Sequence, residues 1–118
     1  AIFNVSHAAM MVAALARGSE KHLGNAFEDA LHQNYRASLI PGMFDVFAAA
    51  KKAGAYGAVL SGAGPCLIAF VPEHRKCTEE VAAAMQEAFL AHDVKARPLH
   101  LRLDTKGARV LRIQQRKR

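Results

Sequence analysis

The sequence predicts an α+β fold, in which a four-stranded antiparallel sheet has helices packed on one face. Three observations lead to this prediction. The 118 residues, of which 52% are hydrophobic, are enough for one domain with a buried core. Three helical segments come first, and two pairs of strand-like segments follow, separated by a fourth helix. Each pair has a short connection, which joins its strands in antiparallel order.

Helical segments occupy the first half of the chain. Residues 2–16 are apolar on nearly every side, which is typical of a buried helix. Ser19 is a suitable N-cap for a second helix over residues 20–31. A turn is predicted over residues 34–42, and a third helix follows it and ends before Gly54.

Two strand pairs with a helix between them account for the second half of the chain. Apolar runs on both sides of Ser61–Pro65 predict the first pair. Thr78 is expected to cap the fourth helix, whose first turn holds two glutamates. The second pair is predicted by the alternating segment Lys95–Leu103, a turn over residues 104–107 and the apolar segment Ala108–Ile113.

Composition and charge exclude several classes of protein. The most apolar stretch, residues 8–16, is about half as long as a membrane span, and no signal-peptide pattern is present. Cys66 and Cys77 lack a metal or redox spacing and predict reduced thiols in a cytoplasmic protein. The net charge of +6 comes from residues 106–118, which hold six bases and no acid. Without a nucleic-acid-binding motif, this basic stretch is typical of a solvated end, and we expect no nucleic acid as a partner.

Residues 57–71 contain a Ser-Gly-Ala-Gly-Pro core between two apolar runs. Glycines at alternate positions allow backbone angles that other residues resist, and they let a loop approach another surface closely. A Walker loop needs a lysine after the last glycine, and a dinucleotide fingerprint opens a helix, so neither applies here. From the spacing alone, a plain hairpin connection and a ligand-contacting loop both stay open.

Two segments taken together resemble a known family. They are residues 31–42, with the sequence LHQNYRASLIPG, and residues 57–65, with the sequence GAVLSGAGP. Both are similar to the C-terminal half of the homoserine kinases, which belong to the GHMP superfamily of small-molecule kinases. The opening residues 1–9 also resemble the helix that enters this half. The glycine loop alone would indicate only the superfamily, whereas the first segment is specific to homoserine kinases.

The resemblance implies one C-terminal GHMP kinase domain over residues 1–118, with a ferredoxin-like variant of the α+β fold. The family's N-terminal nucleotide-binding domain, with its Gly-Leu-Gly-Ser-Ser-Ala loop, is absent from the sequence. The parent enzyme is therefore expected to phosphorylate L-homoserine with ATP, forming O-phospho-L-homoserine in threonine biosynthesis, and the chain alone is expected to be inactive. Two alternatives stay open: another GHMP kinase, and a non-catalytic α+β module that binds an effector or a protein partner.

The resemblance also assigns candidate substrate-binding residues. Arg36 is expected to hold the α-carboxylate of homoserine, because a guanidinium can form two parallel hydrogen bonds with a carboxylate. Asn4 and His32 are further candidates, although a helix cap explains Asn4 more simply and local hydrogen bonding explains His32. The glycine loop is expected to line the cleft by close backbone approach, through Ser61, Gly62, Ala63 and Gly64.

No general base and no metal ligand emerges from the sequence. Mg²⁺ is expected to arrive with ATP and to bind the absent domain, so no cofactor is expected on this chain alone. The surfaces that would face that domain, namely the first helix and the glycine loop, would then be exposed. Because exposed apolar surface drives association, we expect the chain to form a homo-oligomer.

Overall fold

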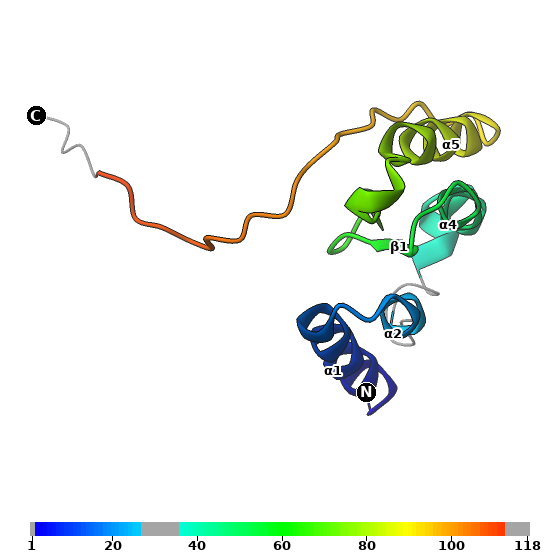
Figure 1. The fold of residues 1–118 in the computed structure, drawn as a ribbon. Coiled ribbons are helices and arrows are strands. Elements are labelled where there is room, and N and C mark those ends of the chain that lie inside the picture. The colour runs from blue at the N-terminus through cyan, green and yellow to red at the C-terminus, as the bar shows by residue number, and fades with distance from the viewer. Residues whose placement is uncertain (1, 27–35, 113–118) are drawn as a thin grey trace, which may run out of the picture.

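The computed structural model describes residues 2–26 and 36–112 of the chain. Over these residues it confirms the α+β class, with a two-stranded sheet and helices around it (Figure 1). None of the described helices is long and apolar enough to cross a membrane. The elements are α1 (Ile2–Arg17), α2 (Glu20–Asn25), η1 (Ala37–Leu39), α4 (Met43–Lys52), β1 (Gly57–Leu60), β2 (Leu67–Phe70), η2 (Glu73–Arg75) and α5 (Thr78–Leu90).

The predicted helices are present, with differences at their starts. Ser19 precedes α2 as predicted, but its hydroxyl lies 2.7 Å from Nδ1 of His22 and makes no capping bond to the backbone. α5 begins at Thr78 itself, so the prediction of Thr78 as cap is wrong and Cys77 occupies that place. An N-cap residue lies just before the first residue with helical backbone angles. Because α5 begins at Thr78, one residue earlier than predicted, its cap position is Cys77. Residues 27–31 of the second predicted helix lie outside the described residues.

α4 lies where the third helix was predicted, between two glycines with positive φ. Gly42 precedes it with a φ of 78°, and Gly54 follows it with a φ of 121°. These angles favour glycine, because a side chain would collide with the backbone. Met43 and Val46 are almost completely buried, in a cluster with Phe89 of α5. α4 therefore forms the centre of the core between the sheet and α5.

The first strand pair forms as predicted. β1 and β2 are antiparallel, with Ala58 opposite Ala69 and Leu60 opposite Leu67. Because side chains alternate along a strand, these four residues share one face of the sheet. Leu60 and Leu67 pack on the cluster around Met43, and Ala58 and Ala69 belong to a second cluster with residues of α4 and α5. Both of these hydrophobic clusters therefore pack on this face of the sheet.

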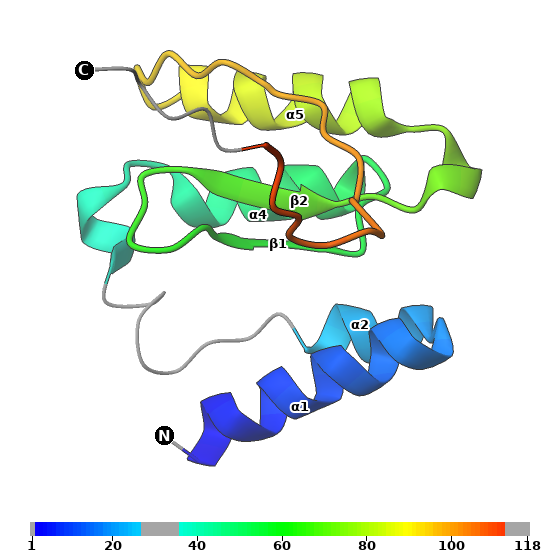
Figure 2. The same cartoon turned by 90° about the vertical axis from the view of Figure 1, so that its left-hand side faces the viewer.

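The opposite face of the sheet is also covered, so the prediction of helices on one face is wrong. Val59 and Phe70 pack against Ala14 of α1 and Leu23 of α2. Figure 2 shows α1 and α2 on the other side of the strands from α5. The physical reason is that the strand sequences GAVL and LIAF have no polar residue, and a strand that is apolar on both faces requires cover on both.

The second predicted strand pair, Lys95–Leu103 and Ala108–Ile113, is not in the sheet of the described residues, so a four-stranded sheet is not confirmed. Figure 1 shows residues 95–112 extended and running away from the helices. At the predicted hairpin turn the Lys106 amide donates to Oδ1 of Asp104 at 2.8 Å, but the chain only bends at residues 105–106 and does not fold back into a strand pair. An alternating pattern specifies an extended backbone, but it does not specify the edge of the β1–β2 sheet that these segments would have to join, which lies far away in sequence.

α1 is a helix as predicted, but it is not buried on all sides. Within it, Ala14 is buried, whereas the side chains of Ile2, Val5 and Val12 are 85%, 69% and 69% exposed. Helical spacing places these three residues on one side of α1. An uncharged apolar face of the domain is therefore open to solvent.

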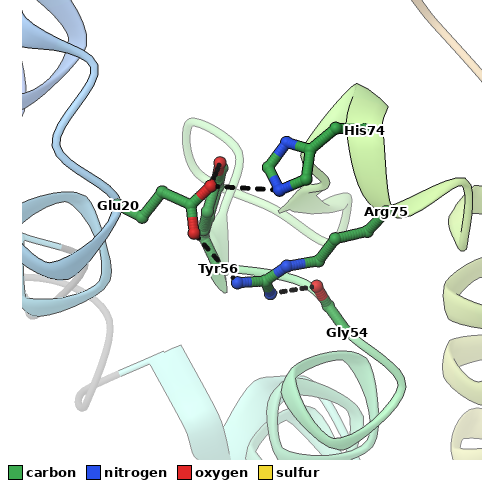
Figure 3. A network of polar contacts seen from close by, with 5 residues as sticks. All are labelled: Glu20, Gly54, Tyr56, His74 and Arg75. Atoms are coloured by element: carbon green, nitrogen blue, oxygen red, sulfur yellow. Dashed lines mark hydrogen bonds and ion pairs between the residues drawn. The ribbon is translucent and has the colours of Figure 1, made fainter.

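A polar network holds α2 against the rest of the domain (Figure 3). Glu20, the first residue of α2, accepts a hydrogen bond from the Tyr56 hydroxyl at 2.9 Å. Its carboxylate also lies 3.1 Å from the Arg75 guanidinium and 3.2 Å from Nε2 of His74. Arg75 in turn donates to the carbonyl of Gly54 at 2.9 Å. The network connects three segments: α2, the connection between α4 and β1, and η2.

The network shifts the titration of Tyr56, which gives a first prediction. Partial burial raises the pKa of Tyr56 above its ordinary value, and the hydrogen bond to Glu20 adds to this increase. The neutral phenol is thus favoured in the folded state. Its contribution to stability is complete below the unfolded value of about 10 and is lost as the pH rises through the higher folded pKa.

A spectrophotometric titration of phenolate absorbance tests this shift. The chain has two tyrosines, Tyr35 and Tyr56, so the difference between the wild-type chain and Tyr56→Phe isolates the second of them. We expect this difference to titrate above the ordinary tyrosine range. Glu20→Gln should lower the midpoint, because it removes the negative charge beside the hydroxyl. A midpoint at the ordinary value would contradict the network.

Candidate functional site

The segment from Ser61 to Cys66 is a tight glycine loop between β1 and β2, as predicted. The Ser61 amide donates to the carbonyl of Cys66 at 2.8 Å, and the Gly64 amide donates to the carbonyl of Ser61 at 3.1 Å. Gly62 and Gly64 have φ values of 59° and 85°, which favour glycine. Ser61, Gly62 and Ala63 are exposed. The loop therefore offers a small, neutral surface that another group can approach closely.

Gly64 brings this loop against the other resembling segment, of which the structure describes residues 36–42. A Cβ atom at Gly64 would lie 2.9 Å from Cδ1 of Leu60 and 3.0 Å from Cδ1 of Ile40, closer than side chains normally pack. Ile40 is buried in the core and belongs to the segment that contains Arg36. The absence of a side chain at Gly64 thus lets the loop and the Arg36 segment lie against each other.

The structure places the predicted site residues as follows. Arg36 is half-buried at the start of η1, four residues before Ile40. Asn4 is half-buried in the first turn of α1, and because that helix begins at Ile2, Asn4 lies inside the helix and is not its cap. His32 lies outside the described residues. The structure therefore brings together, through Ile40, the two segments that carry Arg36 and the glycine loop.

Sequence reasoning missed two residues next to this region. His92, beyond the end of α5, lies with its Nε2 atom 2.7 Å from Oδ2 of Asp45 in the first turn of α4. The imidazole also lies against Gly42, the last residue of the resembling segment. No local pattern marks His92, because the chain has six scattered histidines and this contact joins residues 47 positions apart.

The arrangement places the segment that carries Arg36 against a small, neutral loop, through Ile40 and Gly64. Among residues 2–26 and 36–112, no group of three or more His, Cys, Asp or Glu side chains lies together as in a metal site. The amides of Ser61 and Gly64 are already bonded within the loop, so these two are not presented to a phosphate. A guanidinium can hold a carboxylate through two parallel hydrogen bonds, so the Arg36 side chain suits recognition of a carboxylate on a small molecule.

Comparison with known proteins yields one family and several relatives. The family model described as GHMP kinases C terminal matches residues 11–92 of the chain. The homoserine kinase of Desulfitobacterium hafniense is 40% identical over 94% of this chain, and that of Gloeobacter violaceus is 52% identical over 72% of it. The crystal structure of homoserine kinase from Cytophaga hutchinsonii has a TM-score of 0.67, with 30% identity over 76% of this chain.

The match covers a limited part of each of these proteins. The chain spans 37% of the Desulfitobacterium protein, 28% of the Gloeobacter protein and 28% of the Cytophaga chain. It thus corresponds to about a third of the relatives' length. The part that the family model matches includes both Arg36 and the glycine loop.

Proposed function

The chain belongs to the GHMP kinases, whose C-terminal region it matches, and from this premise we propose that it is the C-terminal part of a homoserine kinase. In this proposal the full-length enzyme transfers the γ-phosphoryl group of MgATP to the side-chain hydroxyl of L-homoserine. The product is O-phospho-L-homoserine, formed in the cytoplasm in threonine biosynthesis. The observation that carries the proposal is the similarity to proteins named homoserine kinase over most of the chain.

The site suggests how this part of the enzyme acts. The Arg36 guanidinium binds the α-carboxylate of homoserine through two parallel hydrogen bonds. The glycine loop lines the same region and allows the substrate to lie close to the backbone, with Gly64 packed on Ile40. Phosphoryl transfer depends mainly on positioning and on stabilisation of charge. This chain therefore contributes substrate orientation, while the phosphates and Mg²⁺ are bound by the N-terminal part of the enzyme.

The alternating segments 95–103 and 108–113 also belong to this proposal. Leu99, Leu101 and Leu103 are 64%, 79% and 85% exposed, and their alternation suits a strand with one buried face. We propose that in the full-length enzyme these segments extend the sheet of β1 and β2 to four strands. Slow amide hydrogen exchange at alternate residues of 95–103 in that enzyme would support this arrangement.

An assay of ADP release tests the proposed function. The full-length enzyme should turn over homoserine with MgATP at a rate within the usual range for kinases, about 1–100 per second. It should prefer homoserine to substrates that are not α-amino acids, such as mevalonate-type, sugar or shikimate-like compounds, which separates a homoserine kinase from other GHMP kinases. The 118-residue chain alone should show no turnover. Kinase-like turnover by the chain alone, or a strong preference for a substrate that is not an α-amino acid, would contradict the proposal.

The exposed face of α1 predicts that the isolated chain self-associates. Ile2, Val5 and Val12 are exposed on one uncharged side of this helix, and apolar patches of this kind form interfaces. Size-exclusion chromatography with light scattering should show a mass above 12.8 kDa that increases with concentration. Val12→Glu should favour the monomer, whereas Ala83→Glu, with the same new charge on an exposed position of α5, should not. A monomer at high concentration would rule out this surface as an interface.

A further inference from the structure

The end of α5 reaches the start of α4 through a histidine. His92 lies two residues beyond α5, and its Nε2 atom is 2.7 Å from Oδ2 of Asp45 in the first turn of α4. An ionised carboxylate can only accept hydrogen bonds, so the imidazole N–H donates to Asp45. The His92 amide also donates to the carbonyl of Phe89 at 3.0 Å, which fixes the backbone from which the imidazole projects. Both ends of the contact are thus held by helices.

The imidazole of His92 occupies the space beside Gly42. A Cβ atom at Gly42 would lie 2.7 Å from Cγ of His92 and closer still to Cδ2. Gly42 has a φ of 78° and ends the turn between η1 and α4. The imidazole therefore covers this turn and restricts its backbone.

The same end of α5 also contacts residues 40–42 through the buried core. Phe89 and Ile40 belong to one buried cluster, and Ile40 extends from there to Gly64 in the glycine loop. Residues 40–42 are thus held between the glycine loop and the end of α5. Arg36 lies four residues before Ile40, at the start of the 3-10 helix that leads into this turn.

We propose that His92, oriented by Asp45, is a positioning residue for homoserine binding. It fixes the turn at Gly42 and thereby the backbone from which Arg36 meets the substrate carboxylate. This inference rests on the proposed function, in which Arg36 binds that carboxylate. The side chains of His92 and Asp45 are 38% and 71% exposed, and an ion pair this exposed adds little to folding stability. The role of the His92–Asp45 pair is therefore to fix the conformation of the turn at Gly42.

Steady-state kinetics of the full-length enzyme tests the inference. His92→Ala should lower kcat/KM for homoserine by up to about 100-fold through a higher KM, because small displacements of a binding group cost this much. The KM for ATP should not change. His92→Gln keeps an N–H donor near the position of Nε2 and should restore most of the loss, and Asp45→Asn should act in the same direction as His92→Ala. His74→Ala is the matched control, because that histidine also pairs with a carboxylate, in the Glu20 network.

Amide hydrogen exchange on the 118-residue chain supplies a readout that does not depend on activity. In His92→Ala, exchange should become faster at residues 37–40 and at Gly42, while Val46 in the core of α4 should be unaffected. Faster exchange there in a protein that does not phosphorylate homoserine would show that His92 fixes the turn at Gly42, but it would overturn the proposed function and with it the role in homoserine binding. Homoserine kinase activity with an unchanged KM and unchanged exchange in His92→Ala would overturn the positioning role. If His92→Ala does not fold, His92→Gln and Asp45→Asn decide by the same two measurements.

Discussion

Arg36→Ala is expected to raise the KM for homoserine of the full-length enzyme about 10- to 100-fold, because hydrogen bonds between charged groups contribute about 1.5–3 kcal/mol. The α-carboxylate does not take part in phosphoryl transfer, so the guanidinium binds it equally in the ground state and the transition state. Loss of such uniform binding raises KM and leaves kcat nearly unchanged. The measurement is the initial rate of ADP release with homoserine varied at saturating MgATP.

Two variants make this result specific to Arg36. Arg36→Lys keeps the positive charge but loses the pair of parallel hydrogen bonds, and it should give an intermediate KM. Arg17→Ala removes the same charge from an exposed position at the end of α1 and should leave KM unchanged. If Arg36→Ala binds homoserine as well as the wild-type enzyme does, Arg36 is a surface arginine beside a turn and the assignment is wrong.

The parts of the fold that were predicted correctly depend on residues close together in sequence. The hairpin of β1 and β2 follows from two apolar runs and a glycine loop of a few residues, and α4 follows from its apolar spacing and from Gly54. In these elements the residues that decide the structure are neighbours. Local propensity and turn chemistry were therefore sufficient.

The parts that were wrong depend on contacts between distant segments. Whether residues 95–103 join the sheet of β1 and β2 depends on contact with an edge of that sheet, which is far away in sequence and which the alternating pattern does not specify. The cover of Val59 by α1 and α2 also comes from far away in the chain. In the site, the resemblance indicated Arg36 and the loop. The contact of Ile40 with Gly64 and the orientation of His92 are visible only in the three-dimensional structure. Side-chain packing between segments carries this information, and no short pattern contains it.

Gly64→Ala is expected to destabilise the chain by about 2–4 kcal/mol, because it combines backbone strain with overpacking. At a φ of 85° a side chain is strained by itself, and the new Cβ would lie 2.9 Å from Leu60 and 3.0 Å from Ile40. Gly62→Ala is the matched control, since Gly62 has a φ of 59° but a Cβ there would meet no atom within 4 Å. It should cost about 1 kcal/mol, from strain alone. Urea denaturation of both variants gives the two free energies of unfolding.

A double-mutant cycle shows whether the additional cost comes from the contact between the loop and the Arg36 segment. Ile40→Val removes the Cδ1 atom that a Cβ at Gly64 would approach, and alone it should cost about 0.5–1.5 kcal/mol. Combined with Gly64→Ala it should recover part of the loss, so the two effects should be less than additive. In the full-length enzyme Gly64→Ala should also weaken homoserine binding, because the loop and the Arg36 segment are forced apart. Equal costs for Gly62→Ala and Gly64→Ala, with additive effects of Ile40→Val, would mean that the two segments are not in contact.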